Sequence, residues 1–128
     1  MESYIPAWPV DSIAAEAGRL ALADANSTAT ARDANARERN WLKGALQALA
    51  LEVFPSRANY LLVRLAQARD GLELWRRLIA KHRIVIRSCA NFEGIDERYF
   101  RIGVRTNAEN RMLVEALTEE LNSKSHGR

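Results

Sequence analysis

Residues 87–105 read RSCANFEGIDERYFRIGVR, and their pattern sets the fold expected for this chain. In the segment 99–105 apolar and polar residues alternate, as in a strand with one buried face. Its apolar face is formed by Phe100, Ile102 and Val104, and its other face by Tyr99, Arg101, Gly103 and Arg105. Arginine in a strand is costly unless it meets water or an anion. The stretch therefore predicts a sheet that displays arginine on one face.

The segments on either side of this stretch complete an α+β pattern. Helices are expected over 13–24, 29–50 and 71–81, and a final helix follows the capping box of Thr106 and Glu109. Strands are expected over 51–54, 59–65, 83–87 and 99–105, and the first two should pair as a hairpin. We expect a small, mostly antiparallel sheet of three or four strands packed with helices. Residues 1–10 would form an arm, 11–122 the domain and 123–128 a frayed tail.

Apolar spacing predicts which helix residues face the core. The alanine-rich first helix should pack closely against a neighbour, with a break at 25–27 before the second helix. The inward residues expected in the third helix are Leu72, Trp75, Leu78 and Ile79. Those expected in the last helix are Met112, Leu113, Ala116, Leu117 and Leu121.

Composition limits the classes of function. The chain has 128 residues, one cysteine, two histidines and a formal net charge of +3. We expect neither a disulfide nor a metal site, because the histidines and the cysteine are too few. No apolar run reaches the ~20 residues of a membrane span, and residues 1–6 do not resemble a secretory signal. No basic stripe indicates nucleic-acid binding. The expected location is cytoplasmic.

Arg101 and Arg87 are the candidate binding residues. Gly103 lies beside Arg101 on the same strand face and leaves room for a ligand. The planar guanidinium suits a carboxylate or phosphate. The alternative is a solvent-facing sheet on which both arginines pair with acidic residues of the intervening loop, namely Glu93, Asp96 or Glu97.

Other residues have simpler interpretations. Arg64 and Arg105 are expected to be solvated strand-end residues, and Cys89 to be an ordinary buried or half-buried thiol. His82 follows a helix and would interact favourably with its C-terminal dipole. Trp8, between two prolines, could be a packing anchor or the wall of a site.

Four segments, in order, resemble the C-terminal domain of threonine-phosphate decarboxylases, which are relatives of histidinol-phosphate aminotransferases among the fold-type I pyridoxal-phosphate enzymes. The segments are PAWPVDSIA (6–14), SRANYLLV (56–63), residues 86–105 and TNAEN (106–110). The resemblance covers about residues 5–122. One departure is Asp11, where the family usually has asparagine. An added carboxylate at this position would repel an anionic substrate.

The resemblance implies roles for particular residues. Arg101 matches the arginine that grips the substrate carboxylate, and Arg87 matches a second arginine near the anionic groups, including the phosphate. Asn59, Trp8 and the loop 91–92 match positions near the mouth of the active site. The family's cofactor lysine is not matched, because Lys43, Lys81 and Lys124 lack its serine-x-histidine-lysine setting.

These matches imply the substrate-binding domain of an enzyme that uses pyridoxal 5'-phosphate, either a decarboxylase in cobalamin biosynthesis or a histidinol-phosphate-type aminotransferase. Alone, the chain is expected to be inactive and to hold no cofactor covalently. Its partners would be the missing cofactor-binding large domain and an amino-acid phosphate, and a homodimer is possible. A non-enzymatic binding or scaffold module that kept the fold is the other hypothesis.

Overall fold

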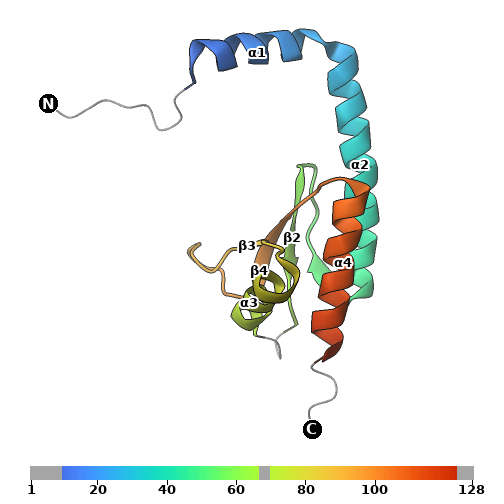
Figure 1. Cartoon of the computed structure of the whole chain (residues 1–128), viewed down its shortest axis with the longest axis vertical. Coiled ribbons are helices and arrows are strands. Elements are labelled where there is room, and N and C mark those ends of the chain that lie inside the picture. Colours follow the sequence, from blue (N-terminus) through green and yellow to red (C-terminus); the bar gives the residue numbers. More distant parts are fainter. Residues whose placement is uncertain (1–9, 67–69, 124–128) are drawn as a thin grey trace, which may run out of the picture. The chain divides into compact units, whose positions relative to one another are not determined.

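The computed structural model describes residues 10–66 and 70–123, and the chain divides into two compact units, 1–34 and 35–128. Four helices and four strands follow one another in the order α1, α2, β1, β2, α3, β3, β4, α4 (Figure 1). Helix α2, Ala25–Ala48, contributes to both units.

The first unit contains α1, Ser12–Ala23, and the first residues of α2. Asp11 caps α1 by accepting a hydrogen bond of 2.7 Å from the Ala14 N–H. The expected break at 25–27 is wrong, because these residues begin α2. Asp24 alone separates the two helices, and its side chain accepts a hydrogen bond of 2.9 Å from the Ser27 N–H. The expectation of close packing is wrong for the described structure, since α1 has no buried residue.

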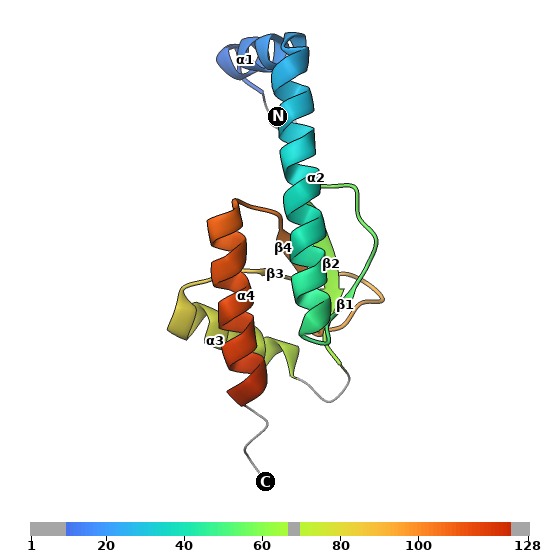
Figure 2. The same cartoon turned by 90° about the vertical axis from the view of Figure 1, so that its right-hand side faces the viewer.

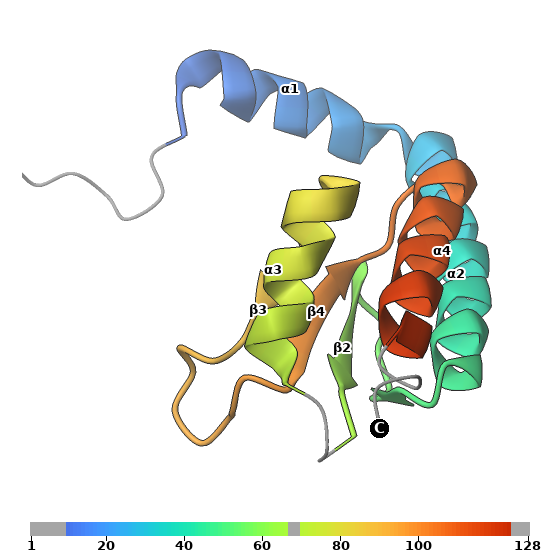
Figure 3. The same ribbon diagram turned by 60° about the horizontal axis from the view of Figure 1, so that its bottom comes forward.

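The second unit contains a four-stranded sheet whose neighbouring strands are all antiparallel. Its strands are β1, Glu52–Val53; β2, Tyr60–Arg64; β3, Arg87–Ser88; and β4, Tyr99–Gly103. Their order across the sheet is β1-β2-β4-β3, and Figure 3 shows the two long strands, β2 and β4, side by side. The α+β class, the antiparallel sheet and the β1–β2 hairpin are confirmed.

One face of this sheet carries the core. The buried strand residues are Val53, Leu61, Val63, Phe100 and Ile102. They form one cluster with leucines of α2, α3 and α4. Outward-pointing residues alternate with them, so β4 shows the pattern expected from its sequence. The helices thus cover the apolar face and leave the arginine face of the sheet open.

Helix α3, Gly71–His82, begins at the cap Asp70 and closely approaches the loop before β4. A Cβ on Gly71 would lie 1.9 Å from the Glu97 carbonyl oxygen, so only glycine fits there. Leu74 and Leu78 are the buried members of α3. The inward placement of Leu72 was wrong, because its side chain is 42% exposed.

The strand expected over 83–87 is shorter than predicted and begins only at Arg87. Arg83 adopts the left-handed conformation, with φ of 56°, and its N–H donates to the Ile79 carbonyl at 3.1 Å. The Ile84 N–H donates to the Leu78 carbonyl, which completes a C-terminal cap of α3. The indole N–H of Trp75 donates to the Ile86 carbonyl at 2.8 Å. The carbonyl of the residue just before the strand is therefore bound by a side chain and not by a neighbouring strand.

Helix α4, Asn107–Asn122, starts with the predicted capping box of Thr106 and Glu109, which is confirmed. Leu113, Ala116, Leu117 and Leu121 are buried as expected, whereas Met112 is 58% exposed and its inward placement was wrong. Strand β4 ends at Gly103 rather than at residue 105. The Asn110 side chain accepts a hydrogen bond from the Arg105 N–H and donates one to the Arg105 carbonyl. The backbone of Arg105 is therefore not available for strand pairing.

Within the second unit, the C-terminal half of α2 runs beside α4 (Figure 2). Asn110 donates to the Glu38 carboxylate at 3.0 Å, and Arg111 lies over the Trp41 ring at 4.9 Å. Within residues 10–66 and 70–123, no helix is both long and apolar enough to cross a membrane.

Candidate functional site

The open face of the sheet brings the two candidate arginines together. Arg87 of β3 is directly opposite Arg101 of β4, and Leu62 of β2 is opposite Arg101 on the other side. Residues directly opposite each other in an antiparallel pair project to the same face. Both arginines are exposed. Two like charges in this arrangement repel each other, so the pair favours an anion between or above them.

The alternative interpretation, in which Arg87 and Arg101 pair with Glu93, Asp96 or Glu97, is not supported by the ion pairs among the described residues. Asp96 instead binds Arg98, whose guanidinium donates to both carboxylate oxygens, the shortest contact being 2.6 Å. The side-chain hydrogen bonds from Arg98 hold the pKa of Asp96 below its usual range. Across the described residues, neither Arg87 nor Arg101 has an ion pair, although Arg87 reaches the Asn91 side-chain oxygen at 3.5 Å.

Tyr60 contacts the Arg101 side chain. The guanidinium carbon of Arg101 lies 4.3 Å from the centroid of the Tyr60 ring. Tyr60 is directly opposite Gly103, and a Cβ on that glycine would meet nothing within 4 Å. The space that the sequence predicts beside Arg101 is therefore present. Sequence reasoning missed Tyr60, although a tyrosine at the start of an exposed strand face was the available signal.

Arg64 lies on the same face but is already neutralised. Its guanidinium forms an ion pair with Glu52 of the neighbouring strand and donates a hydrogen bond of 3.1 Å to the Tyr99 hydroxyl. These partners raise the pKa of Arg64, the Tyr99 hydrogen bond contributing most. Arg64 thus differs from Arg101, which has no acceptor among the described residues.

The other residues considered in the sequence differ in burial and in their hydrogen-bond partners. Asn59 is exposed and reaches this region through its backbone, where its carbonyl accepts a bond of 2.8 Å from the Val104 N–H. Trp8 lies outside the described residues. Cys89 is buried as expected, and Arg105 pairs with Glu109 at 2.8 Å at the end of the strand.

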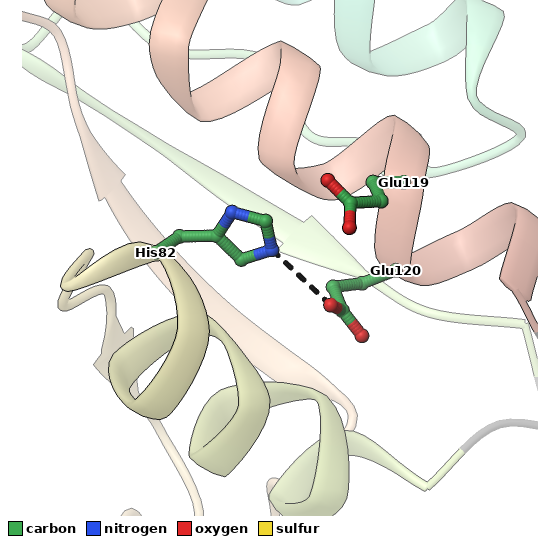
Figure 4. A group of neighbouring side chains, drawn as sticks. All are labelled: His82, Glu119 and Glu120. Atoms are coloured by element: carbon green, nitrogen blue, oxygen red, sulfur yellow. Dashed lines mark hydrogen bonds and ion pairs between the residues drawn. The ribbon is translucent and has the colours of Figure 1, made fainter.

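A second charged cluster joins α3 to α4 (Figure 4). Glu120 of α4 is fully buried, and its Oε1 atom lies 3.0 Å from Lys81 Nζ and 3.1 Å from His82 Nε2. Its Oε2 atom lies 3.3 Å from Arg77 Nε. Burial is the largest single influence and raises the pKa of Glu120, but the hydrogen bonds with Lys81 and His82 and the charges of Lys81 and Arg77 together hold the pKa below its ordinary value. His82 therefore has a specific carboxylate partner besides the helix dipole.

Together with the neighbouring Glu119, two members of this cluster form a group that could hold a metal ion. The ligand atoms of His82, Glu119 and Glu120 lie within 4.8 Å of one another. A count of histidine and cysteine could not find it, because two of its three members are carboxylates. Lys81 and Arg77 already supply positive charge to Glu120, and a cation would have to displace them. The arrangement is better suited to an ionic link between helices.

The two described lysines have surroundings of their own. Lys81 is bound to Glu120, and Lys43 is a half-buried residue of α2. Lys124 lies outside the described residues. Arg87 and Arg101 suit the anionic groups of a substrate, whereas a Schiff base with pyridoxal phosphate requires a free lysine amine. The described residues of the site can thus bind and orient an anion.

Comparison with known proteins assigns the chain to an enzyme family and shows that it covers only part of the length of its relatives. The family model "Aminotransferase class I and II" matches residues 1–117. The threonine-phosphate decarboxylase of Salmonella typhimurium is 42% identical over 115 residues, which cover 89% of this chain but 31% of that protein. The chain therefore spans about a third of the length of this relative.

Solved structures agree with this assignment. The histidinol-phosphate aminotransferase of Clostridium acetobutylicum superposes with a TM-score of 0.82 at 28% identity, covering 94% of this chain and 36% of that one. The histidinol-phosphate aminotransferase of Sinorhizobium meliloti, solved in complex with pyridoxal 5'-phosphate, gives 0.70 at 26% identity, covering 80% and 28%. These neighbours have the fold of fold-type I pyridoxal-phosphate enzymes. The chain belongs to the aminotransferase class I and II family.

Proposed function

We propose that this chain is the small, C-terminal, substrate-binding domain of a pyridoxal-phosphate-dependent threonine-phosphate decarboxylase of cobalamin biosynthesis. The observation that carries the proposal is the facing pair Arg87 and Arg101, which lies on an open sheet face with no ion-pair partner among the described residues. The similarity to the Salmonella enzyme supports the choice of substrate. Residues 11–122 would be the domain, working in the cytoplasm.

In this proposal Arg101 binds the substrate carboxylate and Arg87 binds the phosphate. Asn59 and Trp8 would border the entrance to the site. Pyridoxal phosphate, held by the large domain that makes up the rest of the enzyme, supplies the electron sink. The arginines contribute orientation, because fixing two anionic groups fixes the bond at the α-carbon that is presented to the cofactor.

A titration with O-phospho-L-threonine, followed by NMR of the arginine side chains, tests the anion site on the chain itself. We expect the Nε–Hε signals of Arg87 and Arg101 to shift. Arg101→Ala should weaken binding by about 10- to 100-fold, the value of one or two charge-assisted hydrogen bonds. Arg64→Ala is the matched control, since Arg64 is already paired with Glu52, and it should change binding by less than about twofold. Equal losses in both variants, or no loss in Arg101→Ala, would remove the proposed site.

A histidinol-phosphate-type aminotransferase is the second candidate, favoured by the high structural similarity to the Clostridium enzyme. The two activities differ in the bond that breaks at the α-carbon, which is to the carboxylate in one and to hydrogen in the other. The chain co-expressed with a cofactor-binding large domain of this family should release CO2 from O-phospho-L-threonine. Amino-group transfer from histidinol phosphate to a 2-oxo acid would favour the second candidate. Neither reaction, together with specific capture of an unrelated protein, would favour a non-enzymatic module.

A further inference from the structure

We propose that Tyr60 is a positioning residue for Arg101: its ring holds the guanidinium in place while leaving the arginine's hydrogen-bond donors free for an anion. This inference rests on the proposed anion site. It adds a residue of β2 to a site otherwise made from β3 and β4, and it gives the exposed tyrosine of that strand a role.

The register explains how the contact forms. Tyr60 is directly opposite Gly103, and Arg101 is the diagonal neighbour two residues earlier on β4. Diagonal neighbours in an antiparallel pair are within reach of aromatic and long side chains. Because Gly103 has no side chain, nothing from the directly opposite position covers the Tyr60 ring. Arg101 can therefore lie over that ring, with its guanidinium carbon 4.3 Å from the centroid.

The contact restricts Arg101 without occupying its donors. A guanidinium stacked on an aromatic ring is attracted through its flat face, whereas its N–H groups point outward from its edge. An exposed arginine otherwise samples many rotamers, and an anion must select one of them on binding. Stacking on Tyr60 reduces this number before the anion arrives, which is preorganisation of the binding group.

A second arginine–tyrosine pair on the same face provides the contrast. The guanidinium carbon of Arg64 lies 5.7 Å from the Tyr99 ring centroid, and the same arginine donates to the Tyr99 hydroxyl and to Glu52. Its donors are used by the protein. Arg101 contacts its tyrosine through the ring and has no carboxylate partner among residues 10–66 and 70–123. Of these two arginines, Arg64 is thus neutralised by the protein, whereas Arg101 lies against a tyrosine ring and keeps its hydrogen-bond donors available for an anion.

Two substitutions in the full chain separate the ring from the hydroxyl. Tyr60→Phe keeps the ring, and Tyr60→Leu removes it while keeping apolar bulk. In the wild type and in Tyr60→Phe, the Arg101 Hε signal should be shifted upfield by the ring, and the dissociation constant for O-phospho-L-threonine should agree within about twofold. In Tyr60→Leu the upfield shift should vanish, and binding should weaken by about three- to fivefold, the value of an exposed cation–π contact.

The outcomes are distinguishable from those of the proposed function. Arg101→Ala that binds as tightly as the wild type, or a wild type that does not bind at all, would overturn the anion site and this inference together. Loss of binding in Arg101→Ala with full binding in Tyr60→Leu would overturn the role of Tyr60 alone. Equal weakening in Tyr60→Phe and Tyr60→Leu would assign the effect to the hydroxyl and overturn stacking. If Tyr60→Leu loses the native amide spectrum, Tyr60→Val, which suits a strand, takes its place.

Discussion

At the residue scale, Asn110 shows how one buried side chain sets the end of a strand. Its carbonyl oxygen accepts from the Arg105 N–H at 3.1 Å, and its amide nitrogen donates to the Arg105 carbonyl at 2.9 Å. The same nitrogen donates to Glu38 of α2. The residue is 1% exposed. Asn110 therefore ties together the end of β4, the start of α4 and a residue of α2.

Asn110→Ala should lower the free energy of unfolding by about 2 kcal/mol, because three hydrogen bonds of a buried amide are lost together. Amide exchange at Arg105 should also become faster. Urea denaturation and hydrogen exchange measure these effects. Asn107→Ala is the control, since exposed Asn107 also contacts Glu38, at 3.3 Å, and it should cost less than about 1 kcal/mol. Equal costs for the two variants would contradict the assigned role of Asn110.

The facing arginines are also a residue-scale feature. Alternation within β4 was enough to place Arg101 on the face away from Phe100 and Ile102, and the structure agrees. That Arg87 stands directly opposite could not be predicted from the alternation, because the register of β3 depends on where the chain turns after α3. The left-handed Arg83 and the Trp75–Ile86 hydrogen bond delay that strand to residue 87.

At the element scale, the link between α3 and α4 depends on one buried carboxylate. Glu120 has no exposed surface, and Arg77, Lys81 and the His82 ring of α3 surround it. A buried carboxylate is tolerated only where such partners compensate for its lost hydration. The sequence contained a signal for this buried carboxylate, because Glu120 lies on the otherwise apolar face of α4 formed by residues 113, 117 and 121. Its partners on α3 could not be identified before the two helices were placed.

Glu120→Gln should lower the free energy of unfolding by about 2 kcal/mol at pH 7, since Lys81 loses its charged acceptor. The pKa of Glu120 is lowered in the folded protein. Its stabilising effect is therefore complete above the unfolded pKa of about 4.3 and is lost as the pH falls through the folded value. The difference between wild type and variant should shrink as the pH is lowered from 5, as measured by urea denaturation at several pH values.

Glu119→Gln is the matched control for this prediction, because Glu119 is the exposed neighbour on the same helix. Its stability should stay within about 0.5 kcal/mol of the wild type. A difference between wild type and Glu120→Gln that stays constant from pH 7 to pH 3 would contradict the proposed role of the charge. Zinc-dependent stabilisation of the wild type would instead favour the metal-binding interpretation of this cluster.

At the scale of the whole molecule, the chain has the sheet that presents the arginines, and it matches about a third of its Salmonella relative. Helix α1 belongs to the first unit and has exposed apolar side chains, of which Ile13 and Leu22 are more than 80% exposed. Apolar surface of this kind is typical of a segment that meets another part of a protein.

Incubating the chain with pyridoxal 5'-phosphate and reducing with borohydride should give no specific lysine adduct. The physical reason is that the amine of Lys81 is bound to Glu120 and that Lys43 is half-buried in α2. Peptide mass spectrometry checks this, with the histidinol-phosphate aminotransferase of Sinorhizobium meliloti, solved in complex with pyridoxal 5'-phosphate, as the positive control. A stoichiometric adduct on Lys43, Lys81 or Lys124 would show that the chain holds the cofactor itself.

The α+β class, the capping box at Thr106, the hairpin and the orientation of Arg101 could all be predicted from the sequence, because these features depend on local periodicity and on neighbouring residues. The three-dimensional packing was needed to find that Arg87 faces Arg101, that Arg101 lies over the Tyr60 ring and that Glu120 meets Lys81 and His82. These contacts join residues between 14 and 41 positions apart in the numbering of the chain. Strand register and helix packing create them, and neither is encoded in the pattern of a single segment.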